Sequence, residues 1–255
     1  EQALAAQVGE PAERARALVG LGELCHALAD LTPAERYLAE GLALWTQVGD
    51  PRWIAWAHFQ TGMLAASKGR QAQAITELEA GLALYRQLDD RWGVATVLNQ
   101  LGSVAITTGK YAQAASYLDE AIPLMRSLGD RRTGLAVSLN ALGRIVLAQG
   151  KTPQAVACFE EALDIFAERN VREGLAWTQI NLGLAWLQAG ELPAAARALR
   201  TCLDQYIELD MIIGVTAALN GLAALAASRG QHADAARLHA VVNRLCREHD
   251  CHLTE

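Results

Sequence analysis

The sequence predicts an all-α solenoid of about six helix–turn–helix repeats, each about 40 residues long. The first observation is a small residue that recurs at the same place in successive repeats, at Gly22, Gly62, Gly102, Gly143, Gly183 and Ala223. The second is an alanine twelve residues after each of them, at Ala34, Ala74, Ala114, Ala155, Ala195 and Ala235. A fixed period of this length is the signature of a solenoid, in which each helix pair buries its apolar face against its neighbours.

The first helix of a repeat is clearest in the segment 91–130. Its apolar residues recur at intervals of three and four, at Val94, Val97, Leu98, Leu101 and Ala105. That interval predicts a helix over residues 92–108. Gly109 is expected to end it, because glycine adopts the left-handed conformation of a helix end without a clash.

The second helix of the same repeat is predicted over residues 114–128. Its apolar stripe runs through Ala114, Leu118, Ala121, Leu124 and Leu128, and it stops at the turn pair Gly129-Asp130. Gly102 and Ala114 are expected where the two helices approach each other closely, with Leu118 filling the space around the contact. A larger side chain at either small residue would push the helices apart.

The repeats divide the chain into the ranges of about 11–50, 51–90, 91–130, 131–170, 171–210 and 211–250. The step from Gly102 to Gly143 is 41 residues, because Thr133 is an extra residue in its connector. We expect a single array over residues 1–255 with no internal domain boundary. Residues 1–10 match the end of a repeat, since Gln7-Val8-Gly9-Glu10-Pro11 resembles Gln47-Val48-Gly49-Asp50-Pro51, and 251–255 form a tail. The chain is therefore expected to be part of a longer protein.

Charge and composition argue against a nucleic-acid partner, a membrane span and a disulfide framework. The net charge of −6 and the absence of a basic patch argue against direct contact with nucleic acid. No run of apolar residues is long enough to span a membrane, and no signal peptide opens the chain. The five cysteines are odd in number and unrelated in spacing, which favours reduced thiols and a cytoplasmic location over a disulfide framework.

The order Leu101-Gly102, Ala114, Leu118 and Ala121 resembles the tetratricopeptide repeat, a helix–turn–helix unit. The resemblance covers essentially the whole chain. It implies a right-handed superhelix whose first helices line a concave groove. The repeat here is 40 residues and lacks the family's late proline, whereas the family's unit has about 34. We therefore expect longer helices.

Two further stretches are similar to a more specific group. The connector Leu-Gly-Asp-Arg at 128–131 and the ending at 235–245, AARLHAVVNRL, resemble the C-terminal repeat region of bacterial signal-transduction ATPases and related regulators. That group includes the maltotriose-responsive transcription activator. In those proteins a nucleotide-binding switch and an output domain precede the solenoid, which senses an inducer or a partner. The resemblance implies that any ATPase activity lies in an upstream part of the protein.

No catalytic motif is present, and we predict no enzymatic activity, cofactor or metal in this chain. Gly150-Lys151-Thr152 ends like a phosphate-binding loop, but six residues separate Gly143 from Gly150, where the motif needs four. The one cluster of soft ligands comprises His239, Cys246, His249, Cys251 and His252. A metal is conceivable there, but the polar end of a repeat array explains the same residues.

Ligands of tetratricopeptide arrays usually contact each first helix at three positions, six and three residues before the glycine and one after it. In the first repeat these are Arg16, Val19 and Glu23. The candidate ligand-binding residues in the later repeats are Trp56, Phe59, Met63, Asn99, Ser103, Asn140, Arg144, Trp177, Ile180 and Asn220. Apolar anchors and side-chain amides together suit an extended peptide or a helix. The alternative is that Trp56, Phe59 and Trp177 pack between neighbouring first helices.

The sequence thus predicts a non-catalytic protein- or peptide-interaction and sensor module of a larger bacterial regulator, with its ligand in the concave groove. Two alternatives stay open. One is a structural scaffold that forms homo-oligomers through an exposed end, and the other is the domain of a transcription activator that binds a small inducer.

Overall fold

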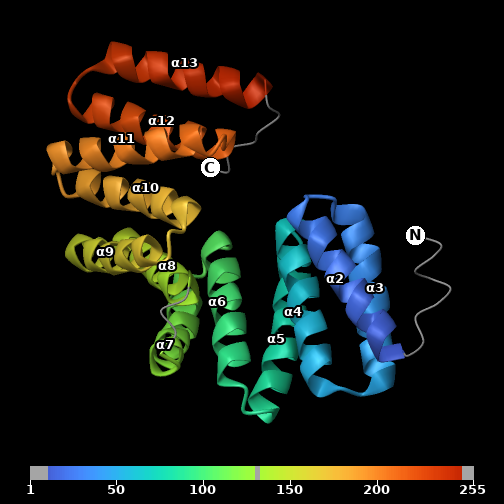
Figure 1. The fold of residues 1–255 in the computed structure, drawn as a ribbon. Helices are drawn as coiled ribbons and strands as arrows, with labels where there is room; N and C mark the ends of the chain where they lie inside the picture. Colours follow the sequence, from blue (N-terminus) through green and yellow to red (C-terminus); the bar gives the residue numbers. More distant parts are fainter. Residues whose placement is uncertain (1–10, 130–132, 249–255) are drawn as a thin grey trace. The chain divides into compact units, whose positions relative to one another are not determined.

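The computed structural model describes residues 11–129 and 133–248 and contains only helices within them (Figure 1). The helices of the first half of the chain, called unit 1 below, are α2 (Pro11–Ala27), α3 (Leu31–Val48), α4 (Pro51–Ser67), α5 (Gln71–Gln87), α6 (Arg91–Thr107) and α7 (Tyr111–Ser127). Unit 2 helices are α8 (Thr133–Ala148), α9 (Thr152–Glu168), α10 (Arg172–Gln188), α11 (Leu192–Glu208), α12 (Ile212–Ser228) and α13 (His232–Glu248). The predicted all-α fold of helix pairs repeating about every 40 residues is confirmed.

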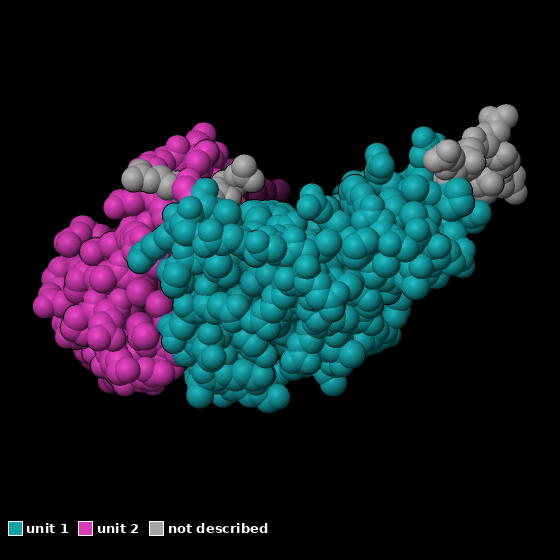
Figure 2. Space-filling model, turned by 90° about the horizontal axis from the view of Figure 1, so that it is seen from below, with its two compact units in different colours: residues 1–128 teal, residues 129–255 magenta. Residues whose placement is uncertain are grey.

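The two compact units are Glu1–Leu128 and Gly129–Glu255, coloured separately in Figure 2. Each contains three antiparallel helix pairs. In unit 1 the first helices α2, α4 and α6 contact one another in sequence, and in unit 2 α8, α10 and α12 do the same. A single array across both units stays a prediction.

The first five helix pairs close on the glycine of their first helix, as predicted. A Cβ atom added at Gly143 would lie 2.4 Å from Phe159 Cε1, and one added at Gly62 would lie 2.8 Å from Leu78 Cγ. Gly102 is less tightly enclosed, at 3.2 Å from Leu118. The partner residue follows the glycine by 16 positions in each of these pairs. The absent side chain is therefore what lets the two helices approach.

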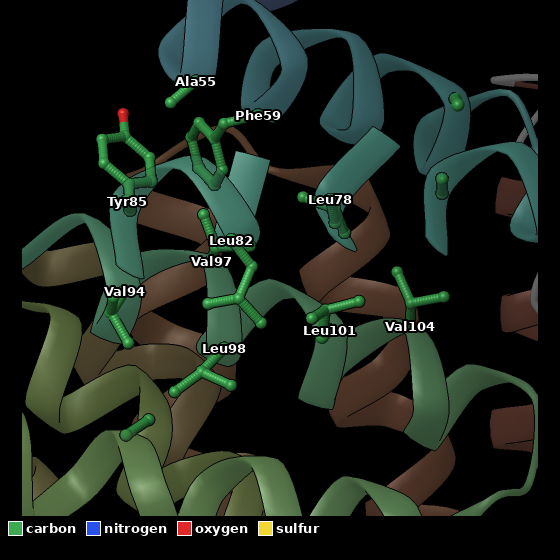
Figure 3. Close-up of a cluster of buried hydrophobic side chains, with 13 residues drawn as sticks. Ala55, Phe59, Leu78, Leu82, Tyr85, Val94, Val97, Leu98, Leu101 and Val104 are labelled. Atoms are coloured by element: carbon green, nitrogen blue, oxygen red, sulfur yellow. The ribbon is translucent and has the colours of Figure 1, made fainter. Parts of the chain in front are cut away.

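Successive pairs join through a second small residue at the start of the next first helix. A Cβ atom at Gly93 would lie 2.3 Å from the ring of Tyr85, and one at Gly214 would lie 2.1 Å from the ring of Tyr206. Figure 3 shows the resulting core of unit 1, where Tyr85 and Phe59 lie near Val94 and Val97. Tyr85 and Tyr206, each near the end of a second helix, thus pack on the helix pair that follows.

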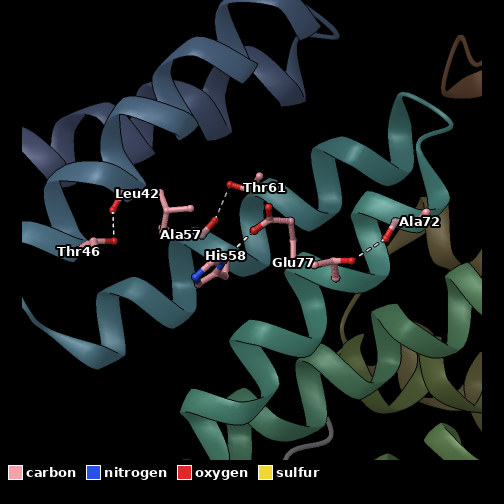
Figure 4. A network of polar contacts seen from close by, with 8 residues as sticks. Leu42, Thr46, Ala57, His58, Thr61, Ala72 and Glu77 are labelled. Atoms are coloured by element: carbon pink, nitrogen blue, oxygen red, sulfur yellow. Dashed lines mark hydrogen bonds and ion pairs between the residues drawn. The ribbon is translucent and has the colours of Figure 1, made fainter.

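Polar contacts also link helices of unit 1, both within a pair and between pairs. His58 Nδ1 lies 2.7 Å from Glu77 Oε2 and links α4 to α5 (Figure 4). Lys68 and Arg70 both donate to the Glu35 carboxylate of α3, and these hydrogen bonds lower the pKa of that carboxyl group. Ion pairs near the surface contribute little stability individually, so the framework depends mainly on the apolar contacts.

None of the helices in the described part of the chain is long and apolar enough to cross a lipid bilayer. The last helix, α13, buries only Ala235 and Val242. His239 is exposed there, at the position where the other pairs carry a buried leucine or phenylalanine. The predicted polar face of this pair is therefore present.

Candidate functional site

The main candidate site is a cavity of about 520 Å³ on unit 1. We call it the aromatic cleft, and its lining residues are Arg16, Val19, Gly20, Glu23, Arg52, Trp53, Trp56, Tyr85, Asp90 and Trp92. They come from the first helices α2, α4 and α6 and from the end of α5 with the residue that precedes α6. The cleft contains half of the tryptophans in the sequence, which number six.

Trp53 is held in place by the start of α4. The Asp50 side chain accepts hydrogen bonds from the backbone N–H groups of Arg52 and Trp53 and so caps that helix. The Trp53 ring then stacks on buried Trp45 of α3, with ring centroids 5.2 Å apart and planes 8° apart. The local sequence therefore fixes one wall of the cleft.

Trp56 lies one helical turn further along α4. Its indole N–H donates to Glu23 Oε1 of α2 over 2.6 Å, which fixes the orientation of the ring. Its ring centroid lies 5.3 Å from that of Phe59 and 6.4 Å from that of Trp92, and the Trp92 plane is tilted by 26°. Trp92 is 40% exposed. Two tryptophans from neighbouring first helices thus form an accessible apolar surface.

The charged residues of the cleft differ in the interactions that they make with the protein. The Asp90 side chain accepts a hydrogen bond from Gly93 N over 3.0 Å and caps α6, and Glu23 accepts from Trp56. The Arg16 guanidinium lies over the Trp53 ring, 5.4 Å from its centroid, which is cation–π geometry. Within the described ranges neither Arg16 nor Arg52 is paired with a carboxylate.

Tyr85 contributes a neutral hydroxyl group. Burial raises its pKa to about 12, and the nearby Asp90 charge acts in the same direction, while Arg52 opposes them. The phenol is therefore protonated at neutral pH. The cleft combines an apolar floor with two arginines and two hydrogen-bonded carboxylates, and it has no arrangement of a nucleophile with a base.

The structure separates the predicted site residues of unit 1 into two groups. Trp56 lies in the aromatic cleft together with Arg16, Val19 and Glu23 of the first repeat. Phe59 and Asn99 are buried, at 7% and 8% exposure, and lie outside the cleft, so their contact with a ligand stays a prediction. Phe59 packs into the core between helix pairs, which was the alternative interpretation. Met63 is half-buried against the same core, and exposed Ser103 lies outside the cleft.

In unit 2 Asn140 is fully buried, and its contact with a ligand likewise stays a prediction. Its amide N–H donates to Thr178 Oγ1 over 2.6 Å, and its carbonyl oxygen accepts from Asn181 Nδ2 over 2.6 Å. Both partners lie on α10, so the nitrogen and the oxygen of the amide each take part in joining two helices. This buried network explains a polar residue on an apolar helix face.

The other candidates in unit 2 are more accessible. Trp177, Ile180 and Asn220 are half-buried, and Arg144 is exposed. Ile180 packs against the cluster that contains Cys202 and Tyr206. A ligand-binding role for these four residues stays a prediction.

Several residues of the aromatic cleft were not predicted: Arg52, Trp53, Tyr85, Asp90 and Trp92. The contact positions taken from the family resemblance begin six residues before the glycine, whereas Trp53 and Trp92 lie in the first helical turn. The sequence did contain a signal for these two tryptophans. Arg52-Trp53 and Trp92-Gly93 occupy the second and third positions of consecutive repeats, so each repeat has a tryptophan at the start of its first helix. Adjacent first helices that contact each other bring such positions together.

The other chemical candidates have structural explanations. Gly150 has a φ of +76° and lies in the short connection between α8 and α9, so Gly150-Lys151-Thr152 is a helix-pair turn. The described part of the chain holds no group of three or more His, Cys, Asp or Glu side chains placed to bind a metal. His249, Cys251 and His252 lie outside the described residues.

Comparisons with solved structures agree with this architecture. BtubC from P. vanneervenii is 21% identical, with a TM-score of 0.66 over 78% of this chain and 82% of that one. A Rap protein in complex with the competence and sporulation factor is 18% identical, with a TM-score of 0.75 over 94% of this chain and 66% of that one. The signal transduction ATPase with a tetratricopeptide repeat sensor from Pyrococcus horikoshii is 17% identical, with a TM-score of 0.72 over 94% of this chain and 38% of that one. At these identities the likeness concerns the fold.

A search of curated proteins finds no match. The model of the tetratricopeptide repeat family matches residues 13–87 and 93–168, which together exceed half of the chain. Both matched ranges begin in a first helix and contain complete helix pairs. The chain belongs to the tetratricopeptide repeat family.

Proposed function

We propose that this chain is a non-catalytic interaction and sensor module that holds a peptide or protein segment in the aromatic cleft of unit 1. The observation that carries the proposal is the concentration of Trp53, Trp56, Trp92 and Tyr85 around one cavity of about 520 Å³. Cavities of roughly 300–1,000 Å³ are typical of ligand sites. Tryptophan and tyrosine are the residues that most often dominate binding energy at protein interfaces.

The aromatic side chains are positioned before any ligand arrives. Trp53 is stacked on Trp45, and Trp56 is hydrogen-bonded to Glu23. A preorganised surface loses less side-chain entropy on binding than a flexible one. Trp92 is the most accessible of the three tryptophans and is the natural first contact for a partner.

The similar structures support a role in regulation. The Rap protein is complexed with the competence and sporulation factor, and the Pyrococcus horikoshii protein is a signal transduction ATPase with a tetratricopeptide repeat sensor. This chain spans 66% of the first and 38% of the second. We therefore extend the proposal to a sensor within a larger bacterial regulator, where binding shifts the repeats between two arrangements. The extended proposal includes an ATPase or a transcription-regulating part upstream of this chain.

Self-association is the second candidate. Leu24 near the end of α2 and Leu28 in the turn after it are 56% and 72% exposed, and exposed leucines near each other favour contact with another apolar surface. Sedimentation of the parent and of a Leu24→Glu, Leu28→Glu variant separates the two functions. A scaffold would dissociate in the variant, whereas a monomeric parent excludes the scaffold.

Peptide selection tests the leading proposal. Random linear peptides displayed on phage would be selected on the whole chain, and the enriched peptides would be titrated into variants. Trp56→Ala and Trp92→Ala are each expected to weaken binding by about tenfold or more, because each removes an aromatic contact surface. Trp92→Ala is informative even if Trp56→Ala perturbs the fold, since Trp92 is exposed.

The matched control is Trp186→Ala, which removes a half-buried tryptophan of α10 outside the aromatic cleft. Peptides that bind the parent, Trp56→Ala and Trp92→Ala with equal affinity would place the binding surface elsewhere. Failure to enrich any peptide would also count against a peptide-binding module.

A further inference from the structure

We propose that the segment bound in the aromatic cleft is acidic, with a side-chain carboxylate that Arg16 and Arg52 bind beside an apolar side chain that packs on Trp53, Trp56 and Trp92. The inference rests on the proposed function and specifies the chemistry of its ligand. It follows from how the four charged residues of the cleft are engaged.

The two carboxylates already have protein donors. Glu23 Oε1 accepts from the Trp56 indole over 2.6 Å, and Asp90 Oδ1 accepts from Gly93 N over 3.0 Å. Each interaction has a structural task, since one orients Trp56 and the other caps α6. A cationic ligand that bound either carboxylate would compete with these hydrogen bonds. It would thereby disturb the wall of the cleft on which its own binding depends.

The two arginines are in the opposite situation. Both are exposed, both line the cleft, and neither has a carboxylate partner in the described part of the chain. Other arginines of unit 1 are paired, such as Arg70 with Glu35 and Arg86 with Glu120. Two guanidinium groups without a carboxylate partner thus lie beside the aromatic surface.

The position of Arg16 prepares it for an anion. Its guanidinium lies over the face of Trp53, 5.4 Å from the ring centroid. A guanidinium that stacks on an aromatic ring keeps its N–H groups at the edge of its plane, where they can donate two parallel hydrogen bonds to a carboxylate. The same arrangement leaves the Trp53 edge and Trp56 for an apolar neighbour of that carboxylate. The cleft therefore offers one surface for each part of an acidic, apolar segment.

Three capped peptides that differ in one residue test the inference: acetyl-Gly-Leu-Asp-Leu-Gly-amide and its Asn and Lys counterparts. Binding would be followed on the whole chain labelled with 5-fluorotryptophan, by the ¹⁹F shifts of the cleft tryptophans. The Asp peptide is expected to bind about tenfold more tightly than either counterpart, because charge-assisted hydrogen bonds are roughly twice as strong as neutral ones. In an Arg16→Gln, Arg52→Gln variant the Asp and Asn peptides should bind equally.

Two further variants sharpen the result. Arg14→Gln removes an exposed arginine of α2 that does not line the cleft and should keep the preference for Asp. Arg16→Lys, Arg52→Lys keeps the charges without the planar donor pair and should lose most of the preference. Equal affinities in the parent, tighter binding of the Lys peptide, a preference retained in Arg16→Gln, Arg52→Gln, or no shift with any peptide would each overturn the inference. The proposed function would still stand if peptides selected on the chain require Trp56 and Trp92.

Discussion

Gly143→Ala is expected to lower the free energy of unfolding by about 2 kcal/mol, because overfilling a packed contact costs roughly 1–3 kcal/mol. The new Cβ atom would lie 2.4–2.8 Å from three ring atoms of Phe159, which is fully buried. A rigid ring cannot bend away as a flexible side chain can, so helices α8 and α9 must separate. Urea denaturation followed by circular dichroism measures the effect.

Two glycine positions supply matched controls in the same kind of helix. Gly102→Ala meets Leu118 at 3.2 Å, a contact that a leucine can relieve, and alanine gains about 1 kcal/mol of helix propensity over glycine. Its net change should be close to zero. Gly20→Ala has no atom within 4 Å and should raise stability by up to about 1 kcal/mol. Equal changes in all three variants would show that the Gly143–Phe159 contact does not set the helix separation.

Asn140→Ala is expected to destabilise the chain by about 2 kcal/mol, since leaving a buried polar group without its partner costs roughly 1–3 kcal/mol. The substitution removes both 2.6 Å hydrogen bonds that join α8 to α10 and leaves Asn181 Nδ2 without its acceptor. Thermal unfolding of the variant beside the parent measures the loss.

The control is Asn220→Ala on α12, where the amide is only half-buried. That change should stay within about 0.5 kcal/mol, as is usual for substitutions away from buried networks. An Asn140→Ala variant as stable as the parent would mean that this amide has no structural task, and it would favour the predicted ligand-binding role of Asn140.

The helix pairs could be predicted because the way in which two helices fit together depends on a few residues that are close in sequence and act through their size. A position with room for little or no side chain shows up as glycine or alanine in every repeat, as at Gly62, Gly102 and Gly143. The partner that fills the gap follows at a fixed distance, as Leu78, Leu118 and Phe159 do. Helix periodicity then places the remaining apolar residues.

The candidate site was predictable only in part. Trp56 was found because its position in the repeat marks the inner side of a first helix. Phe59 and Asn140 occupy comparable positions but are buried, because burial depends on how far the neighbouring helix pair reaches over them. Trp53 and Trp92 belong to different repeats, and their proximity to Trp56 depends on how α2, α4 and α6 pack against one another.

The most direct test is a ¹⁹F spectrum of the whole chain labelled with 5-fluorotryptophan, with each resonance assigned by a single Trp→Phe variant. We predict that a peptide selected on the chain shifts the resonances of Trp53, Trp56 and Trp92 and leaves those of Trp177 and Trp186 in place. Shifts confined to Trp177 and Trp186, with the three cleft tryptophans unchanged at saturating peptide, would contradict the assignment of the aromatic cleft as the binding site.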